Sequence, residues 1–545
     1  MPRYIFVTGG VFSGLGKGIA TASIGLLLKA RGFRVTIVKI DPYINVDAGT
    51  LRPTEHGEVF VTEDGGETDE DIGHYERFLG QNLSARNNIT TGQIYSAVIR
   101  NEREGKYLGK TVEAIPHLTD QIKSRIRDVA LKSQADFVLV EIGGTVGEYQ
   151  NELYYRAARL MRSEGEKVLF CHLVYLPTPH HLGEMKTKPA QQSVEVLGRL
   201  GIQPDLIICR AEHEVDTPRR EKIATFCNVR EDDIISNPDL ESTYNVPLHF
   251  ERQQIAEKIL KKFGMRAKRA DLQRWRQFIL RIRNPKEKVK IGIVGKYFDT
   301  GDFKLSDAYV SVLEAVKHAS AWNWAGADVL WLDAKDFEKS KNNLDILKDL
   351  DGIIVPGGFG SSGVEGKIRA IQYARENDIP FLGLCYGLQL AVIEFARNVC
   401  GLSGANTTEV NPKTPHPVIN LLPGQRKMIE EGKFGATMRL GGQQVKIKRG
   451  TLAFRLYGKE NVIERFRHRY EISPDYVKIL SSKGLVFSGS TPDGTIVQIG
   501  ELPEKRFFLG TQFHPELTSK PLNPSPVFMG FVKACIDYRH SRTDA

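Results

Sequence analysis

The sequence lacks the long hydrophobic run that a membrane span needs. Its uncharged apolar stretch Ile379–Ile393 has 15 residues and includes two glycines, whereas a helix that crosses a bilayer takes about 20 apolar residues. The apolar run near the N-terminus is also far shorter than the ~7–15-residue core of a signal peptide. We therefore expect a cytoplasmic protein with no membrane partner.

Cysteine is scarce, and its spacing excludes two classes of protein. No two cysteines form a CxxC pair, and no Cys/His cluster has the spacing of zinc ligands. A disulfide scaffold and a zinc-binding module are therefore not expected, and free thiols are. The six cysteines are Cys171, Cys209, Cys227, Cys385, Cys400 and Cys535.

Most of the chain has no large excess of positive or negative charge. The formal net charge is +9, but residues 261–290 hold twelve Lys or Arg against two acids, a net of +10, so the other 515 residues carry −1. A nucleic-acid-binding protein would need basic stripes elsewhere. We therefore expect no nucleic-acid partner.

The basic segment has an apolar stripe at helical spacing, formed by Leu272, Trp275, Ile279 and Ile282. This pattern predicts an amphipathic linker helix over 267–288 with a solvated basic face. A subunit contact or an anionic surface is the alternative.

The rest of the chain has the composition of a globular protein, with 41% hydrophobic and 26% charged residues. Its 545 residues exceed one domain of about 100–200. Apolar strand-like runs alternate with helical stretches, which is typical of parallel sheets with crossover helices. We predict an α/β protein with two parallel-sheet domains, at 1–266 and 289–545, joined by the linker at 267–288.

A glycine-rich turn follows the first strand-like run and opens a helical stretch. In this context backbone N–H groups hold a polyphosphate and a lysine reaches its outer phosphates. The strict phosphate-loop pattern fails twice, because five residues separate Gly10 from Gly16 and Gly18 follows Lys17. Without a hydroxyl at that position, carboxylates must hold the metal. A tight turn without a ligand is the alternative.

Candidate carboxylates lie at the ends of other strands. Glu141 ends the apolar run that starts at Phe137, which is the placement of a metal-binding acid at the ligand-binding edge of a sheet. The acidic stretch Glu63–Asp71 offers more acids, or a solvated loop. Lys39, at the end of the second strand, could reach the same phosphates.

Several long strings closely resemble the synthetase domain of the CTP synthase family, over roughly residues 3–250. They are Asp41–Asp47, His56–Asp64, Gly73–Phe78, Glu141–Gly147 and Lys186–Pro189. The resemblance implies a dethiobiotin-synthetase-like phosphate-loop domain. It also implies that ATP, with Mg²⁺, phosphorylates O4 of UTP, and that ammonia then displaces the phosphate.

The same resemblance implies roles for individual residues. ATP would be bound by Gly14, Leu15, Gly16, Lys17, Gly18, Ile19 and Asp71. Mg²⁺ would be held by Asp71 and Glu141, and Lys39 would face the transferred phosphoryl group. UTP and the product CTP would be bound by Ser13, Glu148, Tyr149, Gln150, Lys186, Thr187, Lys188, Pro189, Ala190, Gln191 and Lys222.

A second site is indicated by Cys385, which lies between a strand-like run and an apolar helix. A nucleophile on such a turn is exposed at the sheet edge, where helix N–H groups can lower the pKa of a thiol. A buried structural cysteine is the alternative. His514 and Glu516 follow a later strand and could supply the base and its orienting acid.

Together with Pro356–Gly360, these residues resemble a class I glutamine amidotransferase domain. Thr437–Gly441 and Arg467–Glu471 resemble the version fused in CTP synthases, and the match covers about 289–535. The resemblance implies Cys385 as nucleophile, His514 as base and Glu516 as its partner. Glutamine would be bound by Gly358, Tyr386, Gly387, Leu388, Gln389, Glu409 and Arg469.

The two sites together predict an enzyme that aminates UTP with ammonia from glutamine. The family further implies GTP as an allosteric activator, CTP as a feedback inhibitor and a homotetramer. An ATP-dependent amidase of the cobyric-acid type is one alternative, although the strings at Gly73 and Lys186 argue against it. A partition-type ATPase scaffold is another, but it would leave Cys385 and His514 without a role.

Overall fold

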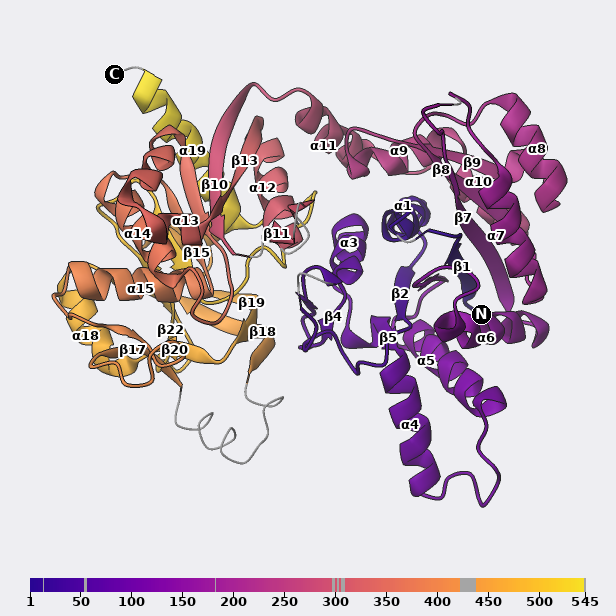
Figure 1. Ribbon diagram of the computed structural model, residues 1–545, viewed down its shortest axis with the longest axis horizontal. Coiled ribbons are helices and arrows are strands. Elements are labelled where there is room, and N and C mark those ends of the chain that lie inside the picture. The colour runs from indigo at the N-terminus through magenta and orange to yellow at the C-terminus, as the bar shows by residue number, and fades with distance from the viewer. Residues whose placement is uncertain are drawn as a thin grey trace. The chain divides into compact units, whose positions relative to one another are not determined.

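The computed structural model describes residues 1–12, 14–52, 56–181, 183–296, 299–300, 303–304, 309–421 and 438–543. The chain forms two compact units (Figure 1). The N-terminal unit comprises Met1–Thr50 and Thr68–Ile279, and the C-terminal unit comprises Leu51–Glu67 and Leu280–Ala545. A piece of the N-terminal sequence, here called the inserted segment (Leu51–Glu67), thus belongs to the C-terminal unit.

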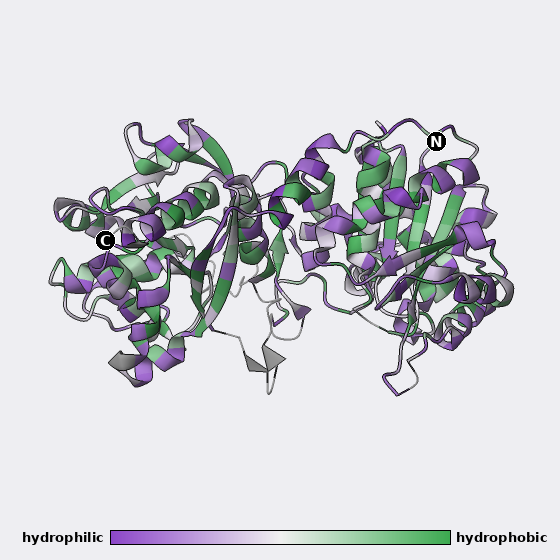
Figure 2. Cartoon of the chain, turned by 90° about the horizontal axis from the view of Figure 1, so that it is seen from above, coloured by the Kyte–Doolittle hydropathy of each residue, from purple (hydrophilic) through white to green (hydrophobic). Residues whose placement is uncertain are grey.

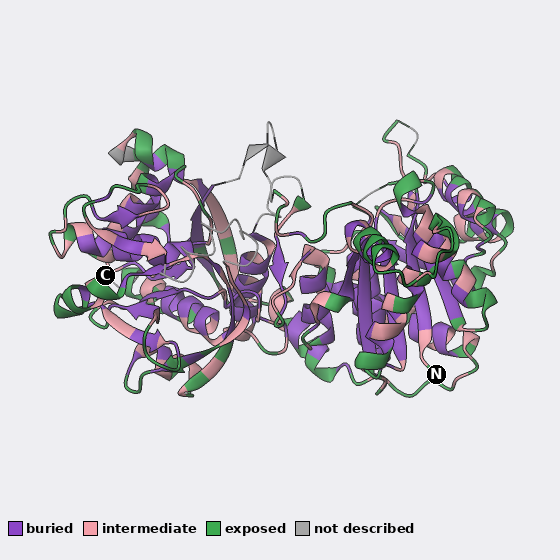
Figure 3. Ribbon diagram, turned by 90° about the horizontal axis from the view of Figure 1, so that it is seen from below, coloured by how far each residue is buried: buried purple, intermediate pink, exposed green. Residues whose placement is uncertain are grey.

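The N-terminal unit is built on a parallel sheet. Its strands, in spatial order, are β5 (Asn88–Thr90), β2 (Val35–Asp41), β6 (Phe137–Ile142), β1 (Arg3–Gly9), β7 (Lys167–Leu176), β8 (Leu206–Ala211) and β9 (Ile234–Pro238). β2 and β6 are buried along their whole length, because helices cover both faces of such a sheet and make its strands continuously apolar. Figure 3 shows these strands as buried.

Helices connect these strands and complete the core. They are α1 (Lys17–Lys29), α3 (Glu70–Leu79), α4 (Thr91–Arg103), α5 (Thr119–Lys132), α6 (Glu152–Ser163), α7 (Lys188–Arg199), α8 (Thr217–Cys227), α9 (Val246–Arg252), α10 (Ile255–Lys262) and α11 (Gln273–Arg283). Phe6 of β1 and Phe170 of β7 stack with ring centroids 5.6 Å apart inside this core. Trp275 of α11 is also buried, and its indole N–H donates to the carbonyl of Tyr244 at 3.0 Å.

The sheet of the C-terminal unit is mixed rather than wholly parallel. Its parallel strands are β13 (Ala325–Asp333), β10 (Glu287–Gly295), β14 (Gly352–Val355), β15 (Phe381–Leu384) and β23 (Phe508–Thr511). Antiparallel strands continue it, namely β22 (Val497–Glu501), β21 (Val486–Ser490), β18 (Arg439–Ile447) and β19 (Asn461–His468). Our expectation of a parallel sheet missed this antiparallel half.

Helices cover both faces of this sheet. They are α12 (Val310–Trp322), α13 (Ala334–Lys339), α14 (Val364–Glu376), α15 (Tyr386–Asn398), α17 (Leu452–Tyr457), α18 (Pro474–Ser482) and α19 (Pro526–Thr543). One apolar cluster lies with α12 and α19, and the other lies with α14 and α15. A small sheet of β16 (Asn406–Thr407), β17 (Pro417–Leu421) and β20 (Tyr470–Ile472) lies outside the main one, and β11 (Asp299–Thr300) pairs with β12 (Phe303–Lys304).

The inserted segment packs on β18 and β19. It carries β3 (Phe60–Val61), and β4 (Glu67–Thr68) pairs with β3 at its end. The buried Arg465 donates to the carbonyl of Val61 at 3.0 Å. Gly442 donates its N–H to the carbonyl of Glu63 at 2.7 Å, and a Cβ on Gly441 would lie 2.6 Å from the nitrogen of Gly65. Two glycines in β18 therefore allow this close approach.

In both units the hydrophobic residues gather in the strands and on the inner helix faces, as Figure 2 shows. Among the helices of the described ranges, none combines the length and the apolar character that crossing a bilayer requires.

Candidate active sites

The phosphate loop lies at the carboxyl end of β1, where ligands of parallel sheets bind. Gly14 and Gly16 have φ of +71° and +81°, a left-handed conformation that favours glycine. Lys17 opens α1, and its ammonium donates to the carbonyl of Gly144 at 2.7 Å. The first N–H groups of α1 have no partner within the helix. Leu15, between these two glycines, is buried, and Ser13 lies outside the described residues.

Gly18 explains why the loop departs from the usual pattern. The Asp71 carboxylate lies where a Cβ on Gly18 would stand. A serine or threonine there would collide with it. Asp71 reaches this place because Asp69 caps α3 and accepts the N–H of Asp71 at 3.0 Å.

Lys39 lies among carboxylates from three elements. Its ammonium contacts Asp71 and lies 3.3 Å from Asp69, and it lies 3.5 Å from Asp41 and 3.8 Å from Glu141. Burial alone would lower the pKa of Lys39, but these four acids raise it well above its ordinary value. Lys39 is therefore a fixed positive charge at this sheet edge.

The same cluster carries surplus negative charge. Burial raises the pKa of both Asp41 and Glu141 to about 7, with Asp69 adding to the shift of Asp41 and Asp71 to that of Glu141, while Lys39 opposes both shifts. Tyr75 donates to Glu141 at 2.5 Å and orients it. Within the described ranges no three His, Cys, Asp or Glu side chains are arranged as a ready chelate. The oxygen donors of Asp71 and Glu141 nevertheless suit Mg²⁺, which needs few protein ligands.

A buried histidine links the phosphate loop to the predicted UTP segment. His172 lies in β7 with its Nδ1 2.8 Å from the Thr8 hydroxyl and its Nε2 2.7 Å from the hydroxyl of Ser193 in α7. All three side chains are buried. Burial, then Lys17, lowers the pKa of His172 to about 3, so the imidazole is neutral. Sequence reasoning missed this connection because His172 lies inside an apolar strand.

The first turn of α7 and the two residues before it hold most of the predicted UTP residues. Lys188 and Pro189 open α7, and Gln191 donates to the Thr187 hydroxyl at 3.1 Å. Ala190 is buried, and Lys186 pairs with Glu184 at 2.7 Å.

The remaining predicted UTP or CTP residues are more exposed. Glu148 accepts from the Thr145 hydroxyl at 2.6 Å, and Gln150 donates to Glu148 at 3.4 Å. Tyr149 is 92% exposed. Lys222 is exposed on α8, which packs against α7.

In the C-terminal unit, Cys385 lies on a strained turn between β15 and α15. Its φ of 50° and ψ of −99° are rare for a residue with a side chain. A Cβ on Gly383 would lie 2.8 Å from the carbonyl carbon of Gly387, and a Cβ on Gly387 would collide with the carbonyl of Val355. The two glycines therefore permit the sharp turn that presents the thiol.

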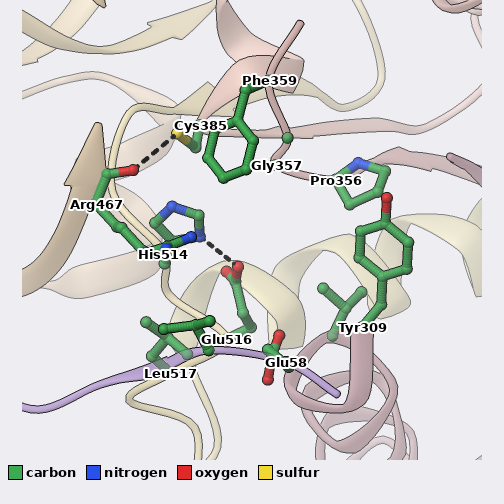
Figure 4. Close-up of a pocket in the computed structure, with 13 residues that line it drawn as sticks. Glu58, Tyr309, Pro356, Gly357, Phe359, Cys385, Arg467, His514, Glu516 and Leu517 are labelled. Atoms are coloured by element: carbon green, nitrogen blue, oxygen red, sulfur yellow. Dashed lines mark hydrogen bonds and ion pairs between the residues drawn. The ribbon is translucent and has the colours of Figure 1, made fainter. Parts of the chain in front are cut away.

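His514 and Glu516 complete a triad with Cys385. Nδ1 of His514 lies 2.7 Å from Oε1 of Glu516, and Figure 4 shows the ring between Glu516 and Cys385. Burial would lower the pKa of His514, but Glu516 and Cys385 raise it well above its ordinary value. The raised pKa favours a protonated His514, which Glu516 orients toward Cys385.

The loop Pro356–Gly360 lies beside the triad and is tied down by residues from other elements. The Lys296 ammonium donates to the carbonyl of Phe359. The Tyr386 hydroxyl donates to the carbonyl of Gly360 at 3.1 Å, and Glu409 accepts the N–H of Gly360 at 2.9 Å. Gly358, in this loop, lines the same pocket as Cys385.

The other predicted glutamine-binding residues lie around the start of α15. Gly387 and Leu388 are in its buried first turn. Gln389 donates to the carbonyl of Tyr470 at 2.8 Å. Arg469, the residue before Tyr470, is half-buried.

The pocket around Cys385 has a wall that the sequence did not predict. Glu58 (labelled in Figure 4) and Val59, both of the inserted segment, line it. Glu58 accepts the N–H of Ser311 near the start of α12 at 3.0 Å. Arg467 lines the pocket too, and its Nε donates to Glu67 at 2.8 Å. The only signal was that His56–Asp64 belongs to a family string.

A Cys–His–Glu triad on a nucleophile turn, and a phosphate loop with facing carboxylates, define a glutamine amidotransferase joined to a nucleotide-using domain. The family model for the CTP synthase N-terminus matches residues 3–265, and that for class I glutamine amidotransferase matches 304–534. The chain belongs to the CTP synthase family. It is thereby a glutamine-hydrolysing ligase of pyrimidine biosynthesis.

Curated relatives match almost the whole chain. The CTP synthase of Pyrococcus abyssi is 52% identical, over 99% of this chain and 99% of its own length. That of Sulfurisphaera tokodaii is 53% identical, over 98% and 99%. A solved glutaminase domain of Trypanosoma brucei CTPS with bound acivicin is 38% identical, with a TM-score of 0.43, and covers 46% of this chain and 94% of its own.

Proposed function

We propose that the two units divide the family's reaction between them. The reaction is the ATP-dependent amination of UTP to CTP with ammonia from glutamine, the last step of CTP synthesis. In this proposal the C-terminal unit releases ammonia and the N-terminal unit activates UTP. The observation that carries it is the triad geometry at Cys385, in which the pKa of His514 is raised by Glu516 and by Cys385.

In the glutaminase half, Cys385 gives its thiol proton to His514 and its sulfur attacks the amide carbon of glutamine. The oxygen that becomes negative accepts from the N–H of Gly358 and from the N–H of Tyr386, the residue after the nucleophile. His514, held by Glu516, gives its proton to the leaving ammonia. It then takes a proton from the water that hydrolyses the thioester. Gln389, Glu409 and Arg469 hold the rest of the glutamine.

In the synthetase half, O4 of UTP attacks the γ-phosphorus of ATP and ADP leaves; ammonia then attacks C4 and displaces the phosphate. Lys17 and the first N–H groups of α1 bind ATP phosphates, and Lys39 faces the transferred group. Asp71 and Glu141 would hold Mg²⁺, which neutralises phosphate charge when bound. Residues 186–191, Lys222 and Glu148–Gln150 form the UTP and CTP site in this proposal.

Further parts of the proposal rest on family membership alone. They are activation by GTP, feedback inhibition by CTP and assembly as a homotetramer. We also propose a cytoplasmic location, and the free thiols of Cys171, Cys209, Cys227, Cys385 and Cys535, all buried, are consistent with a reducing compartment.

The test is Cys385→Ala, assayed for CTP formation with UTP, ATP and Mg²⁺, and with either glutamine plus GTP or ammonium chloride. The variant should lose only the glutamine-driven reaction. Cys400→Ala, which removes a thiol outside the pocket, should keep both. Glutamine-driven activity in Cys385→Ala contradicts the glutaminase assignment. A wild type that makes no CTP from ammonium chloride contradicts the synthetase assignment.

A further inference from the structure

Lys367 of α14 is a buried amine with no hydrogen-bond acceptor among the described residues. Its side chain is 1% exposed. It lies behind the loop Pro356–Gly360, with Nζ 3.9 Å from the place of a Cβ on Gly358. The Tyr386 ring is a further neighbour, with its centroid 5.8 Å from the same nitrogen.

Other buried lysines of this protein have acceptors. Lys17 donates to a carbonyl, Lys39 to carboxylates and Lys296 to the carbonyl of Phe359. A polar group buried without a hydrogen bond costs free energy of folding. Methionine, which has a similar length and no such group, would avoid this cost. Lys367 therefore lowers the folding stability of the protein, at a position next to the loop that holds Gly358.

We propose that Lys367 is a positioning residue of the glutaminase reaction. Its positive charge lies next to the loop Pro356–Gly360 and stabilises the oxyanion that accepts a hydrogen bond from the N–H of Gly358. The inference rests on the proposed role of Cys385 and Gly358. A charge in a water-poor interior acts strongly over several ångströms. Among the described residues, no carboxylate hydrogen-bonds to Lys367 and so none neutralises its field in this way.

The charged and titratable groups that face Lys367 are Lys296 at the end of β10, Asp333 at the end of β13 and Tyr386 in α15. Burial, then Lys296, lowers the pKa of Lys367 to about 7, and Asp333 opposes this. The amine is charged below that pH and neutral above it. Its help to the glutaminase reaction should therefore fade as the pH rises through 7.

The test compares wild type, Lys367→Met and the control Lys478→Met, which changes an exposed lysine on α18. Glutamine hydrolysis is measured in the full chain with ATP, UTP, Mg²⁺ and GTP, between pH 6 and 9. We expect Lys367→Met to lower kcat about tenfold below pH 7, with little change in KM. The ratio of the wild-type rate to the variant rate should fall toward one above about pH 8. Lys478→Met should match the wild type.

A second measurement separates this role from a structural one. The folded-state pKa of Lys367, about 7, lies below its ordinary value of 10.5. The unfolded chain therefore binds more protons between these pH values, so the wild type gains stability relative to a variant without the amine as the pH rises through this range. Its deficit is largest at pH 7 and below. Lys367→Met should have a higher melting temperature at pH 7, and the gain should shrink as the pH approaches 10. A structural lysine would give a lower melting temperature.

Each outcome decides between the proposals. Slower hydrolysis in a more stable Lys367→Met supports the inference. A rate equal to wild type at every pH, or a rate ratio that does not change with pH, overturns it while Cys385→Ala still loses glutamine-driven activity. If Cys385→Ala keeps that activity, the proposed function itself fails. Ammonia-driven CTP formation, which should be unchanged in Lys367→Met, shows that the variant is folded.

Discussion

The Asp71 carboxylate fills the space beside Gly18 that a side chain would take. In phosphate loops of the usual type, a hydroxyl at this position helps to hold the metal. Here the carboxylate reaches the same place from α3, a separate element, and Lys39 holds it there. In place of the usual hydroxyl, this loop thus has the carboxylate of Asp71, which lies 53 positions later in the chain than Gly18.

Gly18→Ser, which restores the common hydroxyl, should damage the enzyme. The new side chain displaces Asp71, and a displacement of about 1 Å in a catalytic group can cost about 100-fold in rate. Ammonia-driven CTP formation should fall by that order. Gly198→Ser, at an exposed position of α7 with open space around it, should have no effect. Full activity in Gly18→Ser would show that Asp71 is not needed where it lies.

The ion pair between Glu67 and Arg467 should matter for glutamine use. The carbonyl oxygen of Arg467 accepts a hydrogen bond from the Cys385 thiol, whose Sγ lies 3.8 Å away. By holding Arg467 in place, Glu67 therefore also stabilises the pocket. Glu67→Gln should lower glutamine-driven CTP formation about three- to tenfold and leave ammonia-driven formation intact. Glu460→Gln, which breaks an exposed pair with Arg449, is the matched control. Equal losses with both nitrogen sources would contradict this role.

The Tyr386 hydroxyl should tune the glutaminase site. Tyr386→Phe removes only the donor to the Gly360 carbonyl, and a hydrogen bond of this kind is worth about 1 kcal/mol. We expect kcat/KM for glutamine to fall about fivefold, with ammonia-driven activity unchanged. An unchanged kcat/KM would mean that Lys296 and Glu409 hold the loop without help.

His172 should make the N-terminal unit sensitive to acid. Its folded-state pKa of about 3 lies below its ordinary 6.5, so the unfolded chain binds more protons between these values. The wild type therefore loses stability as the pH falls below about 6.5. His172→Gln cannot take up this proton, and at pH 7 it should cost about 1–3 kcal/mol because a buried hydroxyl loses its partner. Melting temperatures should thus differ at pH 7 and converge by pH 4. A difference that is constant with pH would contradict a neutral His172.

Local patterns predicted the parallel strands well. The apolar run that ends at Glu141 forms β6, and the strand before Cys385 forms β15, because buried strands in such sheets are continuously apolar. The antiparallel strands β18 and β19 escaped prediction. Their alternating and charged residues do not look buried in the sequence. In the fold, however, Arg465 is buried and donates to the carbonyl of Val61, and the half-buried Arg467 pairs with Glu67.

The sequence allowed roles to be assigned to residues of recognisable motifs, but not to the residues that surround them in the fold. Cys385, His514 and Glu516 belong to recognisable strings. Lys367 and His172 do not, since a lone lysine in a helix and a lone histidine in a strand have no periodic signal. Nor does any local pattern show that Glu58 lines the pocket, because this depends on a contact with β18 and β19, hundreds of residues away.

The inserted segment is synthesised long before the strands on which it packs. Val59, Phe60 and Val61 leave the ribosome about 400 residues before β19, against which they pack. At about 5–20 residues per second, this apolar piece waits roughly 20–80 s for its partner. The N-terminal unit can fold in that time with the segment held out as a loop. A nascent chain of this protein therefore exposes an apolar strand until β18 and β19, in the last fifth of the chain, have been synthesised. The need for chaperones should be highest in that interval.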